Sequence, residues 1–195
     1  PVDAVDPAKL LTRMSYAELK ALAPAIDWDI YFAEIGLPPP AEVVVSDIDE
    51  AAAKATAAQI AERGGVAHAY ALDVSDAEAV ERFVEQVCAE HGVPDVVVNN
   101  AGIGHGGKFL DTPAEQYDRV LEVNLGGVVN CCRSFARRLV ERGTGGHIVN
   151  VASMAAHSPS RPMNAYATSK AAVLMFSDCL RAELSPAGIG LTTIC

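Results

Sequence analysis

The sequence is short of positive charge and of long apolar stretches. Its 195 residues contain 15 Lys and Arg against 25 Asp and Glu, which gives a formal net charge of -10. Because phosphate contacts need clustered Lys and Arg, this balance argues against a nucleic-acid partner. No apolar run approaches the roughly 20 residues that span a bilayer, and no signal peptide is recognisable, so no membrane partner is expected.

Paired cysteines and metal-binding spacings are also missing. The cysteines stand at Cys88, Cys131, Cys132, Cys179 and Cys195, inside helical or strand-like patterns and without a C-x-x-C pair. This usage indicates a reducing, cytoplasmic compartment with buried thiols. The adjacent Cys131 and Cys132 could form a redox-active pair, but burial is the simpler interpretation. No His-Glu-x-x-His or similar spacing predicts a metal site.

What the sequence does contain, from residue 41 onward, is an alternation of β-branched runs and helical patterns. Strands are predicted at 42–47, 66–72, 95–99, 147–152 and 189–195. Helices are predicted at 50–63, 75–91, 113–142 (with a break near Gly126-Gly127) and 164–184, the second of them capped by Ser75. Continuous apolar runs are typical of parallel strands buried on both faces. The alternation therefore predicts an α/β fold, a doubly wound parallel sheet of the Rossmann-like type.

Residues 1–40 do not share this rhythm. Two helical patterns precede Gly36, and Pro38-Pro-Pro40 forms a stiff spacer. We therefore expect a short helical N-terminal leader at 1–40, followed by the α/β domain at 41–195.

The residues suited to chemistry lie after the later strands. Tyr166-Ala-Thr-Ser-Lys170 places a phenol and an ammonium one helical turn apart, on one helix face. Ser153 closes the apolar run 147–153 and would meet them across the top of the sheet. The spacing alone is a weak signal, because Tyr16-Ala-Glu-Leu-Lys20 matches it without a serine-ended strand before it. The neighbouring motifs must therefore carry the assignment.

In order and spacing, residues 41–195 resemble the short-chain dehydrogenase/reductase family. The matching motifs are Asp47, Asp73-Val74, Asn99-Asn-Ala-Gly102, Asn124, Ser153, Tyr166 and Lys170. The resemblance implies an oxidoreductase that transfers a hydride between a nicotinamide and a small-molecule alcohol or ketone.

It also implies catalytic roles for four residues. Tyr166 would exchange a proton with the substrate oxygen, and Ser153 would hold that oxygen by a hydrogen bond. The Lys170 ammonium would favour the phenolate form of the tyrosine and bind the nicotinamide ribose. Asn124 would position a water that feeds Lys170.

The resemblance further implies a set of cofactor contacts. They are Asp47, Asp73, Val74, Asn99, Ala101, Gly102, Tyr166 and Lys170. A carboxylate at Asp47 would accept hydrogen bonds from the adenosine ribose and repel a 2′-phosphate, which favours NAD over NADP. The alternative for Asp47 is a strand-end residue that begins a turn. Gly102-Ile-Gly-His-Gly-Gly107 satisfies G-x-G-x-x-G but follows the wrong strand, and is interpreted as a flexible loop.

The family's first strand and glycine-rich turn are not recognisable ahead of Glu42. No glycine precedes Gly36, so the turn whose amides would hold the pyrophosphate has no counterpart there. The family's C-terminal end would likewise follow Cys195. We therefore expect the sheet to be incomplete.

Residues 9–38 instead resemble a stretch of the M13 (neprilysin-like) zinc metallopeptidases, without any of their zinc ligands. Two interpretations follow: a hybrid of the two families, or a divergent dehydrogenase whose leader takes the place of the first strand. The alternative function is a non-catalytic hybrid or truncated fragment. Copies of the chain are expected to associate through the long helices.

Overall fold

The computed structural model describes residues 42–158 and 161–195. They fall into two compact units, divided between Leu72 and Asp73, and each unit has its own parallel sheet. The expected leader, its M13 resemblance and the question of what fills the place of a first strand concern residues 1–41, outside the described residues. Those expectations remain predictions.

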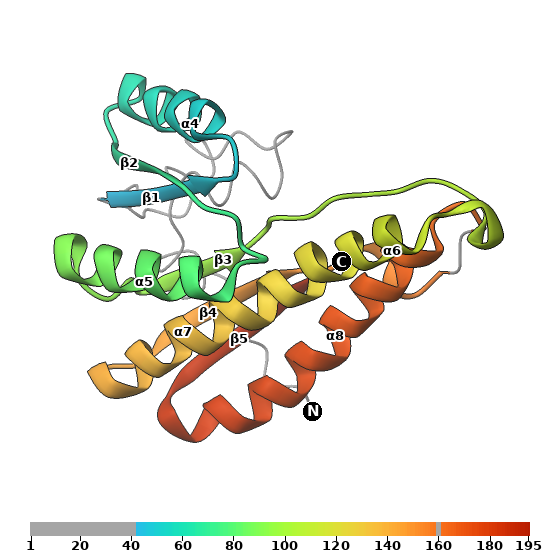
Figure 1. Ribbon diagram of the computed structural model, residues 1–195. Coiled ribbons are helices and arrows are strands. Elements are labelled where there is room, and N and C mark those ends of the chain that lie inside the picture. The colour runs from blue at the N-terminus through green and yellow to red at the C-terminus, as the bar shows by residue number, and fades with distance from the viewer. Residues whose placement is uncertain (1–41, 159–160) are drawn as a thin grey trace. The chain divides into compact units, whose positions relative to one another are not determined.

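The described part of the first unit is a two-stranded sheet with one helix. Its elements are β1 (Glu42–Asp47), α4 (Glu50–Glu62) and β2 (Val66–Ala71), with the two strands parallel. The Asp49 carboxylate caps α4 by accepting from the amide of Ala51, and α4 packs over both strands (Figure 1). After the helix, Gly64 reverses the chain with a φ of 82° that glycine adopts without strain.

The second unit is built on a three-stranded parallel sheet in the order β3-β4-β5. Its strands and longer helices are α5 (Ala77–His91), β3 (Val96–Asn99), α6 (Ala114–Leu121), α7 (Gly127–Arg142), β4 (Gly146–Val151), α8 (Asn164–Leu184) and β5 (Ile189–Ile194). Its short helical segments are η1 (Phe109–Asp111), η2 (Glu122–Gly126), η3 (Met154–Ala156) and η4 (Ser185–Ala187).

Two long helices cover this sheet. α7 packs on β3 and β4, α8 packs on β4 and β5, and α5 packs on α7 (Figure 1). Ile148 and Val149 of β4 have no exposed surface, although they lie on opposite faces of the strand. Phe83 of α5 meets Phe135 of α7 edge to face, with ring centroids 6.3 Å apart.

These elements confirm the predicted α/β class, with parallel strands alternating with helices. The helix expected at 113–142 starts at Ala114 and is interrupted by the π-helical turn η2, which ends at Gly126 where α7 begins at Gly127, so the expected break near Gly126-Gly127 is confirmed. One local expectation needs correction. The cap of α5 is Asp76, whose carboxylate accepts from two helix amides, because the Ser75 hydroxyl is engaged by Asp73 instead.

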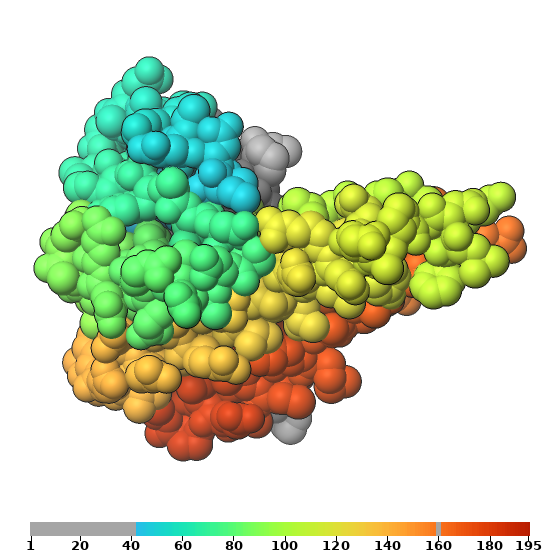
Figure 2. All heavy atoms as spheres, in the orientation of Figure 1, coloured from blue at the N-terminus to red at the C-terminus, as the bar shows by residue number. Residues whose placement is uncertain are grey.

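The loop after β3 is tied to the segment that leads into α8. The amide of Gly107 donates to the carbonyl of Pro162 at 2.8 Å, and the Tyr117 hydroxyl of α6 donates to Asn164 at 3.1 Å. Figure 2 accordingly shows the yellow-green surface of η1 and α6 beside the orange residues before α8.

Within residues 42–158 and 161–195, none of the helices combines the length and the hydropathy that a membrane span needs.

Candidate active site at the start of α8

Tyr166 and Lys170 lie on the first turns of α8, one turn apart. The Lys170 ammonium nitrogen is 5.8 Å from the centroid of the Tyr166 ring and donates to the Val151 carbonyl at 2.7 Å. Only 3% of Lys170 is exposed, and this burial lowers the pKa of its ammonium. An ammonium has three donors, and among the described residues one of them is used.

Ser153 stands where β4 passes into η3, the short helix that packs on α8. Its Oγ accepts from the amide of Ala155 at 3.1 Å. Its own hydroxyl hydrogen has no acceptor among the residues that the structure covers, and the Tyr166 hydroxyl has no partner there either. Both hydroxyls can therefore serve a ligand without breaking a bond of the fold.

Asn124 lies in η2 and is completely buried. Its Oδ1 accepts from the Ile103 amide at 2.8 Å, and its Nδ2 donates to the Ile103 carbonyl at 2.9 Å. The same Nδ2 donates to the Ser169 hydroxyl at 3.0 Å. A π-helical turn often marks a functional position. Here it points the side-chain amide of Asn124 toward α8.

Ser169 is a site residue that the sequence reasoning missed. Its hydroxyl donates to the Tyr166 carbonyl at 2.7 Å, and it has no exposed surface. The one feature of the sequence that points to Ser169 is its position directly before Lys170.

Gly102 brings the loop after β3 against the same groups. A Cβ added at Gly102 would lie 3.3 Å from Asn124 Oδ1 and 3.4 Å from Lys170 Nζ. Ala101 and Gly102 themselves are exposed. The structure thus brings Gly102, Asn124, Tyr166 and Lys170 together, with Ser153 directly before the adjoining η3.

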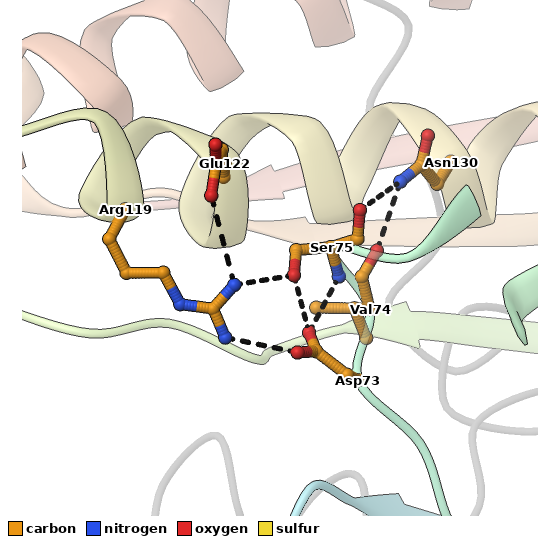
Figure 3. A network of polar contacts seen from close by, with 6 residues as sticks. All are labelled: Asp73, Val74, Ser75, Arg119, Glu122 and Asn130. Atoms are coloured by element: carbon orange, nitrogen blue, oxygen red, sulfur yellow. Dashed lines mark hydrogen bonds and ion pairs between the residues drawn. The ribbon is translucent and has the colours of Figure 1, made fainter. Parts of the chain in front are cut away.

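Asp73 and Val74, two of the predicted cofactor contacts, are held by the polar network in Figure 3. Asp73 Oδ1 accepts from the amide and hydroxyl of Ser75 at 2.9 and 2.6 Å, and its Oδ2 pairs with Arg119 of α6 at 3.0 Å. The Ser75 hydroxyl bond, with the Ser75 amide and Arg119, holds the pKa of Asp73 below its usual range although burial opposes this.

Val74 is held by the opposite end of the network. Its carbonyl accepts from Asn130 Nδ2 of α7 at 3.0 Å (Figure 3). Its side chain fills the space beside Gly127. Backbone and side chain of this segment are therefore both anchored to α7.

The Asn99 side chain forms its hydrogen bonds within the buried core. It donates to Asn150 Oδ1 at 2.8 Å and contacts Cys132 Sγ at 3.3 Å. Asn150 in turn donates to Ser177 of α8 at 2.9 Å. A cofactor contact from Asn99 would therefore have to come from its backbone.

The cysteines follow the buried-thiol interpretation only in part. Burial raises the pKa of Cys131 and of Cys132 to about 12, which disfavours the thiolate that redox chemistry needs. Cys179 and Cys195 are exposed, so the prediction of buried thiols is wrong for those two. A helical or strand pattern does not reveal which face of the element reaches solvent.

Asp47 belongs to the first unit, at the end of β1. Its Oδ1 accepts from the amide of Asp49 at 2.9 Å, which is the turn expected of a strand-end aspartate. Its second oxygen has no partner among the described residues, so the turn and a ribose contact are compatible.

Comparison with known proteins places these features in a family. A family model described as short chain dehydrogenase matches residues 37–195. Over 155 residues the chain is 75% identical to a probable oxidoreductase, EphD, of Mycobacterium tuberculosis (strain ATCC 25618 / H37Rv), covering 80% of this chain and 26% of that protein. The chain thus spans about a quarter of the length of this relative.

Two solved structures share the fold. A short-chain type dehydrogenase/reductase from Mycobacterium marinum has 30% identity and a TM-score of 0.79, covering 95% of this chain and 74% of that one. A short chain dehydrogenase/reductase from Burkholderia phymatum, solved in complex with NAD, has 31% identity and a TM-score of 0.77, covering 84% of this chain and 59% of that one. With the family model matching most of its length, the chain belongs to the short-chain dehydrogenase family.

Proposed function

We propose that this chain is an NAD-dependent oxidoreductase that interconverts an alcohol and a ketone, with Tyr166 as the acid and base. The observation that carries the proposal is the set of unused donors at the start of α8. The Tyr166 hydroxyl, the Ser153 hydroxyl and two N–H groups of the buried Lys170 have no partners among the described residues. A buried ammonium that is only partly satisfied is costly unless a ligand completes it.

These donors fit the nicotinamide end of the cofactor. Lys170 would bind the ribose hydroxyls with its two spare N–H groups, and the close approach of Gly102 to Lys170 leaves backbone rather than a side chain facing that space. When bound, the cofactor supplies or accepts the hydride. Asp47 would bind the adenosine ribose and favour NAD over NADP. Asp73, Val74, Asn99 and Ala101 would border the rest of the cofactor.

The proton chemistry belongs to the chain's own side chains. Ser153 donates a hydrogen bond to the substrate oxygen, which places that oxygen beside Tyr166. In the reduction, the Tyr166 hydroxyl gives its proton to the oxygen as negative charge develops there. The Lys170 ammonium stabilises the phenolate that remains. Asn124 would position the water through which the proton is restored. Oxidation of the alcohol runs the same steps in reverse.

The second candidate function is a non-catalytic hybrid or fragment that associates through its helices. Exposed apolar side chains on the long helices favour association, with Val140 of α7 at 49% and Met175 of α8 at 65% exposure. We propose that copies pair through these helices, in the cytoplasm, with residues 1–40 as a separate leader. Sedimentation of wild type and of Met175→Glu measures this: a monomeric wild type contradicts the pairing.

Fluorescence titration with NADH separates the two functions. The enzyme proposal predicts saturable binding, weaker binding of NADPH, and loss of that preference in Asp47→Ala. Lys170→Met removes the ammonium that would bind the nicotinamide ribose. This variant should weaken NADH binding by about tenfold. A protein that is folded by circular dichroism and shows no saturable NADH binding would rule out the enzyme and favour the fragment.

A further inference from the structure

Ser169 occupies a buried position between two of the site residues. It has no exposed surface, accepts from Asn124 Nδ2 at 3.0 Å, and donates to the Tyr166 carbonyl at 2.7 Å. One hydroxyl thus joins the π-helical turn η2 to the first turn of α8.

The direction of these hydrogen bonds is determined by the donors available. Asn124 Oδ1 must face the Ile103 amide, because a flipped side chain would set its NH₂ against that N–H. Of the two Nδ2 hydrogens, one goes to the Ile103 carbonyl and the other to Ser169. The Ser169 oxygen accepts the hydrogen bond from Asn124 Nδ2. The single hydroxyl hydrogen of Ser169 is then donated to the Tyr166 carbonyl.

This chain of bonds holds three segments in register. It begins at Ile103 in the loop after β3, passes through η2, and ends on the residue that carries the proposed acid and base. Gly102, next to Ile103, approaches both Asn124 and Lys170. A shift of Asn124 would therefore move the loop and the tyrosine turn relative to each other.

A serine in a helix often donates to the carbonyl one turn back, with small structural effect. Ser169 differs because it also accepts from a buried amide that holds the loop. Ser177 provides the comparison: it is equally buried on α8 and accepts from Asn150 at 2.9 Å, two helical turns beyond Lys170 and away from Ile103.

We infer that Ser169 is a positioning residue, which sets the place of Tyr166 and Lys170 against the loop at 101–103. This inference rests on the proposed function for its effect on turnover. Its effect on the loop does not depend on catalysis.

The test compares Ser169→Ala with Ser177→Ala as the matched control. Both variants lose one hydroxyl that accepts from an asparagine, so both should melt at lower temperature by similar amounts. Only Ser169→Ala should lower kcat, by about 10- to 100-fold, because small displacements of reacting groups are costly. It should also displace the pH profile of kcat and leave KM for NADH within about twofold. Equal kcat and equal pH profiles in the two variants would overturn the inference.

Hydrogen exchange gives the readout that does not need turnover. The Ile103 amide, which donates to Asn124, should exchange at least about tenfold faster in Ser169→Ala than in wild type or Ser177→Ala. If Ser169→Ala does not fold, Ser169→Cys keeps a weak donor and acceptor and should show an intermediate effect. Unchanged exchange at Ile103 contradicts the inference, whereas faster exchange in a protein without turnover contradicts the proposed function alone.

Discussion

The Lys170 ammonium donates to the Val151 carbonyl at 2.7 Å, across the junction of α8 and the end of β4. This bond holds a cation with 3% exposure at the point where β4 leads to Ser153. The cation is therefore placed by the fold before any ligand binds.

Replacing Lys170 by Met should lower turnover strongly while changing stability little. The variant loses the bond to Val151 but also the cost of burying an ammonium, and these effects oppose each other. We expect kcat to fall at least about 100-fold. Steady-state kinetics and a thermal melt measure the two effects, and turnover at the wild-type rate would contradict the assigned role.

The pH dependence of stability provides a separate prediction for Lys170. Burial lowers its pKa in the folded state below the ordinary lysine value of 10.5, so the unfolded state holds the proton more tightly. The burial penalty is present below the lowered pKa and disappears as the pH rises through 10.5. The unfolding free energy of wild type relative to Lys170→Met should therefore rise with pH in that window. Urea denaturation at several alkaline pH values measures it, and a flat difference would contradict the prediction.

Gly102→Ala should impair the site, whereas Gly104→Ala should not. The new methyl at Gly102 would crowd Asn124 Oδ1 at 3.3 Å and lie in contact with Lys170 Nζ at 3.4 Å, but at Gly104 the nearest atom is Met163 Cε at 4.0 Å. We expect at least about a tenfold loss of kcat in the first variant and a change within about twofold in the second. Equal activities would show that close packing at Gly102 is not needed.

Gly127→Ala should destabilise the second unit. Its Cβ would lie 2.5 Å from Val74 Cγ2, whereas a Cβ at Gly126 would meet nothing closer than the Leu121 carbonyl at 3.8 Å. Overpacking of this kind costs about 1–3 kcal/mol. Gly126→Ala is the control and should be neutral or stabilising, because alanine favours helix. The double variant Gly127→Ala/Val74→Ala should recover part of the loss in urea denaturation.

Much of the fold follows from local pattern. The bounds of α8 were predicted correctly, and those of the strands to within one residue, because buried parallel strands and helices have different periods of apolar residues. The break near Gly126-Gly127 was predicted, but the π-helical form of the turn η2 was not, since apolar spacing continues through it without proline.

The site was predicted less completely than the fold. A motif locates Tyr166 and Lys170, but the partner of a polar side chain can lie far away in the chain. Arg119 is 46 residues from Asp73, and Ser169 is 45 residues from Asn124. A serine inside a helix also resembles a surface residue until its burial is known, which is why Ser169 was missed.

Asp73→Asn should lower stability at neutral pH. The carboxylate has a lowered pKa because it accepts from Ser75 and Arg119. Its contribution to stability is therefore present above the ordinary aspartate value of 3.8 and is lost as the pH falls through the lowered pKa. About a third of the side chain is exposed, so screening limits the loss to at most about 1 kcal/mol. Urea denaturation near pH 7 and near pH 3 measures the change. Asp76→Asn is the control, because asparagine caps a helix as well as aspartate does.

NADH-dependent reduction of a ketone panel, in wild type and in Tyr166→Phe, tests the central claim most directly. The Tyr166 hydroxyl has no partner among the described residues, so the variant should fold with the wild-type stability and isolate the chemical role of the phenol. We predict turnover in wild type and a loss of at least about 100-fold in Tyr166→Phe. Turnover that survives in Tyr166→Phe would contradict the proposed site.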